Sequence, residues 1–291
     1  MKTLSVGPLT IDWGTQTYVM GIINATPDSF SGDGLLNQKA TVEMSLAQAR
    51  RFVAEGAHIL DVGGESTRPG SQPVSEQQEL ERVVPVVEAI ARELNVAISV
   101  DTYKASVAQA ALDVGAHMIN DVWGCRMDPA MAPLAAERGV PIVLMHNRLR
   151  PKNVAQQERL GGRYLGVKYE DLLGDVVREL IASVNLARAA GVRQEQIILD
   201  PGIGFGKTVS QSLELLNRMD ELRVLGYPLL LGSSRKSFIG YTLDLPPHDR
   251  VEGTATTVAI GIARGADIVR VHDVKEMSRV AKMSDAIVRS V

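Results

Sequence analysis

The sequence has little cysteine, few aromatic residues and almost no excess charge, and each shortage excludes a class of protein. Cys125 is the only cysteine among 291 residues, so neither a disulfide framework nor a cysteine-based metal cluster can form. The 31 basic and 34 acidic residues give a net charge of −3, so we expect neither nucleic acid nor a membrane surface as a partner. This composition fits a reducing, cytoplasmic location.

Long hydrophobic runs are also missing. No stretch approaches the ~18 uninterrupted apolar residues of a membrane span. The N-terminal segment meets Pro8 and Asp12 before any long apolar core forms, so we do not expect a signal peptide. Hydrophobic residues make up 45% of the chain but aromatic ones only 4%, and this balance is typical of the aliphatic core of a parallel α/β protein.

A repeated pattern organises the chain. It occurs as GAHILDVGG from Gly56, GAHMINDVWG from Gly115 and GADIVRVHD from Gly265. An amphipathic run precedes each glycine, which therefore stands where a left-handed helix end belongs, and the apolar residues after it predict a strand. With looser copies of the pattern, eight strands are predicted, ending near Asn24, Gly63, Asp101, Asp121, His146, Asp200, Ser233 and His272.

Eight alternating strand and helix units predict an α/β fold, a (β/α)8 TIM-type barrel, because such barrels commonly run to about 250 residues as one domain. We expect a single domain over residues 1–291, with a short N-terminal cap at 1–16 and the barrel at 17–291. A doubly wound sheet is the structural alternative. Ser75 and Gln78 resemble a capping box at the start of one helix.

Polar residues stand in strands that should be apolar on both faces. Asp61, Asn120 and Arg270 occupy one position of the repeat, and Asp101 and Asp200 end other strands. Each has a structural explanation, such as a helix cap for Asp101, a loop contact for Asp61 or an ion pair across the barrel for Arg270. Because such barrels place their sites at the C-terminal strand ends, the five together favour a binding site.

Basic side chains follow the strands at the same face. Arg68, Lys236, Arg270 and His272 would suit a phosphate or diphosphate there, whereas we expect Arg235 to be a solvated surface charge. No spacing matches a zinc site. Mg²⁺ held loosely by Asn24, waters and substrate oxygens fits better.

Acceptors at Asp101, Asn120 and Asp200 with a donor at Lys236 would complement a flat heterocycle carrying amino and carbonyl groups. The glycine-rich segment ILDPGIGFGKT at 198–208 is not a P-loop, because Pro201 stands where that motif needs its first glycine. These residues therefore predict a barrel that binds a nitrogen heterocycle near a phosphate, and they do not give the reaction.

The chain resembles dihydropteroate synthases from about Tyr18 to its C-terminus. Seven segments occur in family order, namely NATPDSFSGDG (24–34), DVGGESTRPG (61–70), SVDTYK (99–104), INDVWG (119–124), DPGIGFGKT (200–208), GSSRKSFIG (232–240) and RVHDV (270–274). The resemblance implies a transferase of folate biosynthesis that condenses 6-hydroxymethyl-7,8-dihydropterin diphosphate with 4-aminobenzoate and releases 7,8-dihydropteroate and diphosphate.

The resemblance also implies roles for individual residues. Asp101, Asn120, Asp200 and Lys236 would bind the pterin, and Asp101, Asp200 and Lys236 would be catalytic. Asn24 would bind Mg²⁺ and, with Arg68, Arg270 and His272, the diphosphate. The aminobenzoate pocket would be lined by Thr67, Pro69, Phe205, Ser234 and Lys236. Loop 1 would carry Asp28, Phe30 and Asp33.

The implied chemistry is dissociative. The C–O bond to diphosphate would break first, leaving a pterin-stabilised cation that the aromatic amine attacks. The carboxylates of Asp101 and Asp200 would stabilise that cation, and Mg²⁺ with Arg270 would stabilise the departing charge. Loops 27–37 and 64–74 would close over the second substrate and exclude water.

Two departures from the family pattern stand out. Loop 1 reads Ser-Gly-Asp-Gly where Ser-Asp-Gly-Gly is usual, which displaces Asp33 by one position. The segment 147–169 after His146 is longer and more basic than the usual turn. A pterin-dependent methyltransferase and an inactive pterin-binding paralogue are the alternative functions. The family forms homodimers and is a sulfonamide target, but neither oligomeric state nor sulfonamide sensitivity can be read from the sequence.

Overall fold

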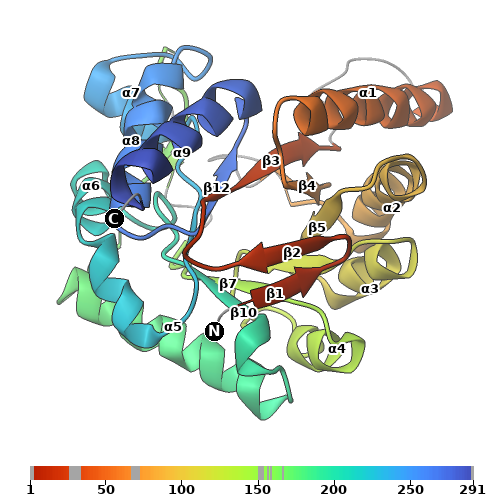
Figure 1. Cartoon of the computed structure of the whole chain (residues 1–291), viewed down its shortest axis with the longest axis horizontal. Helices are drawn as coiled ribbons and strands as arrows, with labels where there is room; N and C mark the ends of the chain where they lie inside the picture. The colour runs from red at the N-terminus through yellow and green to blue at the C-terminus, as the bar shows by residue number, and fades with distance from the viewer. Residues whose placement is uncertain are drawn as a thin grey trace.

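A ring of eight parallel strands forms the centre of the molecule (Figure 1). The computed structural model describes residues 3–25, 34–66, 73–149, 154–155, 157, 159–165 and 167–289. The barrel strands are β3 (Tyr18–Asn24), β4 (Ile59–Gly63), β5 (Ala97–Asp101), β6 (Met118–Asp121), β7 (Ile142–Met145), β10 (Ile197–Asp200), β11 (Leu230–Leu231) and β12 (Ile268–Val271). All eight ends lie within two residues of the predicted positions.

The strands are hydrogen-bonded in the order β10-β7-β6-β5-β4-β3-β12-β11. Leu199 of β10 and Leu229, just before β11, form a parallel bridge between the two end strands, and the Leu199 N–H donates to the Pro228 carbonyl at 2.9 Å. This contact closes the ring. The prediction of a (β/α)8 barrel is confirmed, and the doubly wound alternative is excluded.

Helices surround the barrel. They are α1 (Gly34–Ala54), α2 (Glu76–Glu93), α3 (Ala105–Asp113), α4 (Met131–Arg138), α5 (Leu172–Ala189), α6 (Val209–Asn217), α7 (Ser237–Leu243), α8 (Val251–Ala263) and α9 (Val274–Val288). The predicted capping box at α2 is confirmed, because the Gln78 N–H donates to Ser75 Oγ at 3.3 Å and the Ser75 N–H donates to Gln78 Oε1 at 3.2 Å. The three repeat glycines all have positive φ, as left-handed helix ends require.

The N-terminal cap is a hairpin of β1 (Thr3–Val6) and β2 (Leu9–Asp12). Its buried side chains, Leu4, Val6 and Ile11, pack against the N-terminal ends of the barrel strands, and Figure 1 shows the hairpin lying across that end of the barrel. The hairpin therefore covers the bottom of the barrel. Ligands must approach the strands from the opposite, C-terminal face.

The long segment after β7 contains a second hairpin, of β8 (Val154–Ala155) and β9 (Arg163–Tyr164). The sequence predicted a segment longer and more basic than the usual turn, but no strands. Strands of two residues each are too short to show an alternating pattern. Within the described ranges, none of the helices is both long and apolar enough to cross a membrane.

Candidate active site

Side chains inside the barrel change from apolar to polar along the strands. The layer next to the N-terminal hairpin is apolar and contains Met20, Ile59, Ala97, Met118, Val143, Ile198, Leu230 and Ile268. Side chains two residues apart on a strand share a face, so the next layer includes Asp61, Ser99, Asn120, Asp200 and Arg270. The polar strand residues therefore point into the barrel and not toward the helices.

Arg270 bonds two carboxylates, Asp61 and Asp101, and Asn120 shares the first of them. Arg270 Nε donates to Asp61 Oδ2 at 2.5 Å and its Nη2 to Asp101 Oδ2 at 2.5 Å, and Asn120 Nδ2 donates to the same Asp61 oxygen at 3.0 Å. Asp61 is completely buried. The ion pair across the barrel is confirmed for Arg270, whereas the loop contact considered for Asp61 is wrong.

The helix cap considered for Asp101 is also wrong. The first N–H of α3, from Ala105, donates instead to Asp128 Oδ2 at 2.8 Å. Asp101 turns into the barrel, where burial raises the pKa of its carboxyl group although Arg270 opposes that shift. One carboxylate oxygen of Asp101 accepts from Arg270, and the residue lies at the C-terminal end of its strand, where a ligand would enter.

Asp200 and Lys236 form the second half of the polar cluster. A Cβ atom built on Gly232 would lie 3.6 Å from Asp200 Oδ2 and 3.8 Å from Lys236 Nζ, so both groups border this glycine. Burial raises the pKa of Asp200, opposed by Lys236, and burial lowers the pKa of Lys236 to about 8, opposed by Asp200. A cation and a carboxylate therefore lie close together at this end of the barrel.

The turn 201–206 holds Phe205 against Lys236. Lys236 Nζ lies 4.4 Å from the centre of the Phe205 ring and donates to the Ile203 carbonyl at 2.5 Å. Phe205 also packs with Val122 and Met145 in an apolar cluster at this face. The arrangement offers a flat apolar surface beside a cation, which suits an aromatic ring.

Lys207 points inward beneath this turn. Its Nζ lies 2.9 Å from His146 Nδ1 and donates to the carbonyls of Gly202 and Phe205 at 2.8 and 3.2 Å. The next residue, Thr208, is the N-cap of α6. Segment 198–208 therefore contains the predicted strand end at Asp200, followed by a tight turn within which the Lys207 amine is bonded. Sequence reasoning missed this burial because lysine is almost never fully buried unless paired.

His146 lies in the same buried contact. Its Nε2 is 3.0 Å from Glu179 Oε2 on α5. Burial, reinforced by Lys207, lowers the pKa of His146 to about 4, so the ring is neutral near pH 7. A neutral Nδ1 can then accept from Lys207, which supports the turn that carries Phe205.

Gly202 allows the turn to pass close to the end of β7. Its φ is +67°, and a Cβ atom there would lie 1.8 Å from the His146 carbonyl oxygen. We predict that Gly202→Ala lowers the free energy of unfolding by about 2–5 kcal/mol, from the left-handed backbone and the clash together. Gly226 has a φ of +74° but no atom within 4 Å of such a Cβ, so Gly226→Ala should lose only about 1–2 kcal/mol. Urea denaturation measures both, and equal losses would contradict the close approach.

Ser234 and His272 meet at the rim. Ser234 Oγ lies 3.0 Å from His272 Nδ1 and accepts from the His272 backbone N–H at 3.1 Å. Arg235 beside them is not a solvated surface charge, so that expectation is wrong. Its Nε donates to Asp273 Oδ2 at 2.8 Å, because a positive φ of 56° turns the residue back toward the start of α9.

Asn24 ends β3, opposite Gly63 of β4, and is half-buried at the same face. The described part of the chain holds no group of three or more His, Cys, Asp or Glu side chains that could hold a metal ion. The predicted loop 1 residues Asp28, Phe30 and Asp33, and the predicted ligand contacts Thr67, Arg68 and Pro69, lie outside the described residues. Their roles stay predictions.

A closed parallel barrel whose C-terminal face gathers carboxylates, an amide, a lysine and an arginine defines a TIM-barrel enzyme. The model of the family described as "Pterin binding enzyme" matches residues 20–272. A dihydropteroate synthase from Bacillus subtilis is 52% identical over 286 residues, covering 98% of this chain and 94% of that protein. The chain belongs to the pterin-binding enzymes and, within them, to the dihydropteroate synthase family.

Solved structures agree. The dihydropteroate synthase of Clostridium difficile, determined in the presence of pteroic acid, has a TM-score of 0.87 and 45% identity, covering 96% of this chain and 99% of that one. The Xanthomonas albilineans enzyme with 4-aminobenzoic acid also has a TM-score of 0.87, with 36% identity and 98% of each chain covered.

Proposed function

We propose that the cluster at the C-terminal face joins 6-hydroxymethyl-7,8-dihydropterin diphosphate to the amine of 4-aminobenzoate, releasing diphosphate and forming 7,8-dihydropteroate for folate biosynthesis. The observation that carries this proposal is that Asp101, Asn120, Asp200 and Lys236 come together at the C-terminal end of the barrel interior. They come from strands β5, β6 and β10 and from the loop after β11. Their acceptors and donor match the amino and carbonyl groups of a pterin.

Acidic and basic side chains would have different roles in the reaction. As the bond to diphosphate breaks, positive charge develops on the pterin, and the carboxylates of Asp101 and Asp200 lie where they stabilise it. Arg270 and His272 stand on β12 and at its end, with His272 held by Ser234, and they would bind the leaving diphosphate. The pterin would then lie beside Asp101 and Asp200, with its diphosphate toward Arg270 and His272.

The donors at the rim fit Mg²⁺. Asn24 offers an amide oxygen, and Mg²⁺ usually takes one or two protein oxygens, with waters and substrate phosphates completing its shell. When bound, the ion would help to neutralise the charge of the departing diphosphate. Asn24 would hold it, and Arg270 on the adjacent strand β12 would share the same task.

Diphosphate release tests the function. We expect the purified chain with Mg²⁺ to release diphosphate from the pterin ester only when 4-aminobenzoate is added. Release that does not depend on the amine would reject the synthase, and no release at all would indicate a pterin-binding protein without this activity. A pterin-dependent methyltransferase would not need the amine pocket that Phe205 and Lys236 form.

The pKa of Lys236 predicts how binding depends on pH. Below about pH 8 the side chain is charged and binds the pterin ester, and above it the dissociation constant should rise about tenfold per pH unit. The depressed pKa means that the folded state binds fewer protons than the unfolded one between about 8 and 10.5, so stability rises with pH there and unfolding cannot explain the loss. Calorimetry from pH 6.5 to 9.5 measures the profile, and an identical profile for Lys236→Met would contradict it.

We further propose that the chain acts as a cytoplasmic homodimer. Helices α8 and α9 pack side by side (Figure 1), and they expose Ile260, Met283 and Ile287 by 42%, 62% and 66%. Exposed apolar residues on two adjacent helices favour an interface. Light scattering on the purified protein tests the mass, and a monomer at micromolar concentration would contradict this proposal.

A further inference from the structure

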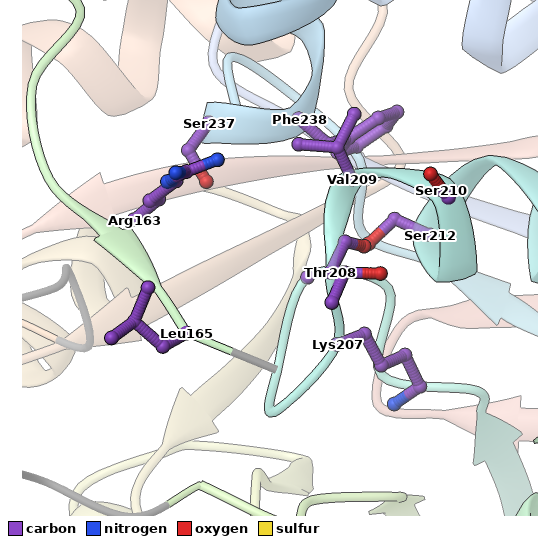
Figure 2. Close-up of a pocket in the computed structure, with 10 residues that line it drawn as sticks. Arg163, Leu165, Lys207, Thr208, Val209, Ser210, Ser212, Ser237 and Phe238 are labelled. Carbon is purple, nitrogen blue, oxygen red and sulfur yellow. The ribbon is translucent and has the colours of Figure 1, made fainter. Parts of the chain in front are cut away.

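A cavity of about 270 Å³ adjoins the cluster on its outer side. Figure 2 shows its lining, which comes from β9, from the turn 201–208, from the start of α6 and from the start of α7. The apolar part of the lining is formed by Leu165, Val209 and Phe238, and the polar part includes Arg163, Ser210 and Ser237. Two basic residues, Arg163 and Lys207, belong to the lining, and the amine of Lys207 already contacts His146 and the carbonyls of Gly202 and Phe205.

The cavity begins where the amine pocket ends. Ser237 directly follows Lys236, and both Ser237 and Gly204 line the cavity. A Cβ atom on Gly204 would lie 3.3 Å from Lys236 Cδ. Gly204 therefore lies between the cavity and the Lys236 side chain of the amine pocket. An aromatic amine placed on Phe205 with its nitrogen toward the pterin would direct the opposite end of its ring toward this cavity.

Arg163 has hydrogen-bonding capacity to spare. Its guanidinium stacks on Tyr241, 4.6 Å from the ring centre. Its Nε is buried without a hydrogen-bond partner, and no carboxylate in the described residues lies within ion-pair distance of it. Figure 2 shows the side chain reaching toward Ser237. A buried donor of this kind is costly unless a ligand or water satisfies it.

The hairpin that carries Arg163 is tied to the active-site loop. Arg250 is buried and donates from Nη2 to the Leu160 carbonyl at 2.8 Å and from Nη1 to the Arg235 carbonyl at 3.0 Å. Tyr241 Oη donates to the Gly161 carbonyl at 3.2 Å. One arginine thus joins the hairpin to the residue before Lys236, which fixes Arg163 relative to the cluster.

We propose that Arg163, on the hairpin β8–β9, is a specificity-determining residue that binds the carboxylate of the amine substrate in this cavity. A guanidinium binds a carboxylate with a planar fork of donors, and the hydroxyl of Ser237 supplies a further donor. The long segment after β7 then has a function, as the outer wall of the amine pocket. This inference rests on the proposed function.

The test compares two amines with the full chain and Mg²⁺. We expect Arg163→Gln to raise the KM for 4-aminobenzoate by about tenfold, while kcat and the KM for the pterin ester stay unchanged. The KM for the neutral analogue 4-aminobenzamide should hardly move. Arg159→Gln is the matched control, because Arg159 lies on the same hairpin but pairs with exposed Asp244; it should leave all constants unchanged.

Two results would overturn this assignment. An equal rise in KM for both amines would mean that Arg163 only supports the hairpin, and no rise for 4-aminobenzoate would mean that its carboxylate lies elsewhere. Both results require a wild-type chain that releases diphosphate when the amine is present. A wild-type chain without that activity would instead overturn the proposed function, so the two failures are distinguishable.

Discussion

Lys236→Ala should lower kcat/KM by about 10²–10³-fold, the usual effect of removing one positioned donor. Lys236 borders both the proposed pterin site and the proposed amine pocket. Its Nζ lies near Asp200, and it is 4.4 Å from the centre of the Phe205 ring. The fold should survive, since burial disfavours the charged form of this lysine and the variant removes that cost. Steady-state assays of diphosphate release measure the activity, and circular dichroism measures the fold.

Lys282→Ala is the control for this change. Lys282 is exposed on α9, so its loss should leave kcat/KM and stability unchanged. Near-normal turnover of Lys236→Ala would remove the lysine from the site. Lost activity together with a lost circular dichroism signal would show that its role is structural.

Arg270→Ala should lower the free energy of unfolding by about 3–5 kcal/mol, because it leaves a buried carboxylate without its cation. Asp61 is completely buried, and Asn120 is its only other hydrogen-bond partner among the described residues. The same variant should weaken binding of the pterin diphosphate ester, which calorimetry measures. Urea denaturation measures the stability.

A double variant separates the two effects of Arg270. Asp61→Asn removes the stranded charge, so Asp61→Asn with Arg270→Ala should recover part of the stability but none of the affinity. Arg50→Ala removes an exposed ion pair with Glu93 and should change stability far less. If Arg270→Ala had the same urea midpoint of unfolding as the wild type, the buried Asp61–Arg270 pair would not stabilise the fold.

The fold could be predicted because its signals are local. A glycine after each helical run and an apolar run after each glycine need no knowledge of distant residues, so the strand ends followed from the pattern. The position shared by Asp61, Asn120 and Arg270 was visible in the same way. Because side chains alternate between the two faces of a strand, residues at this shared position were expected to face the same side of the sheet.

The contacts within the site could not be predicted, because they join distant parts of the chain. Asp61 and Arg270 are 209 residues apart, and nothing in either segment indicates that one completes the other. The burial of Lys207 was not predicted, because its partners His146 and Gly202 meet it only in the folded chain. Arg235 was misjudged for the same reason, since Asp273 lies 38 residues away.

The hairpin β8–β9 shows a further limit. Its basic composition was visible, but its place beside the amine pocket depends on a buried arginine about 90 residues later. Charge alone therefore predicted a basic segment, and only the packing of Arg250 and Tyr241 shows which side of the barrel it covers.

A crystal structure of the chain with the pterin diphosphate ester and Mg²⁺ tests most directly whether these side chains form one site. We expect the pterin ring within hydrogen-bond distance of Asp101, Asn120, Asp200 and Lys236, with its diphosphate on Arg270 and His272. A pterin bound elsewhere, or one that leaves Asp200 and Lys236 without contact, would contradict this site.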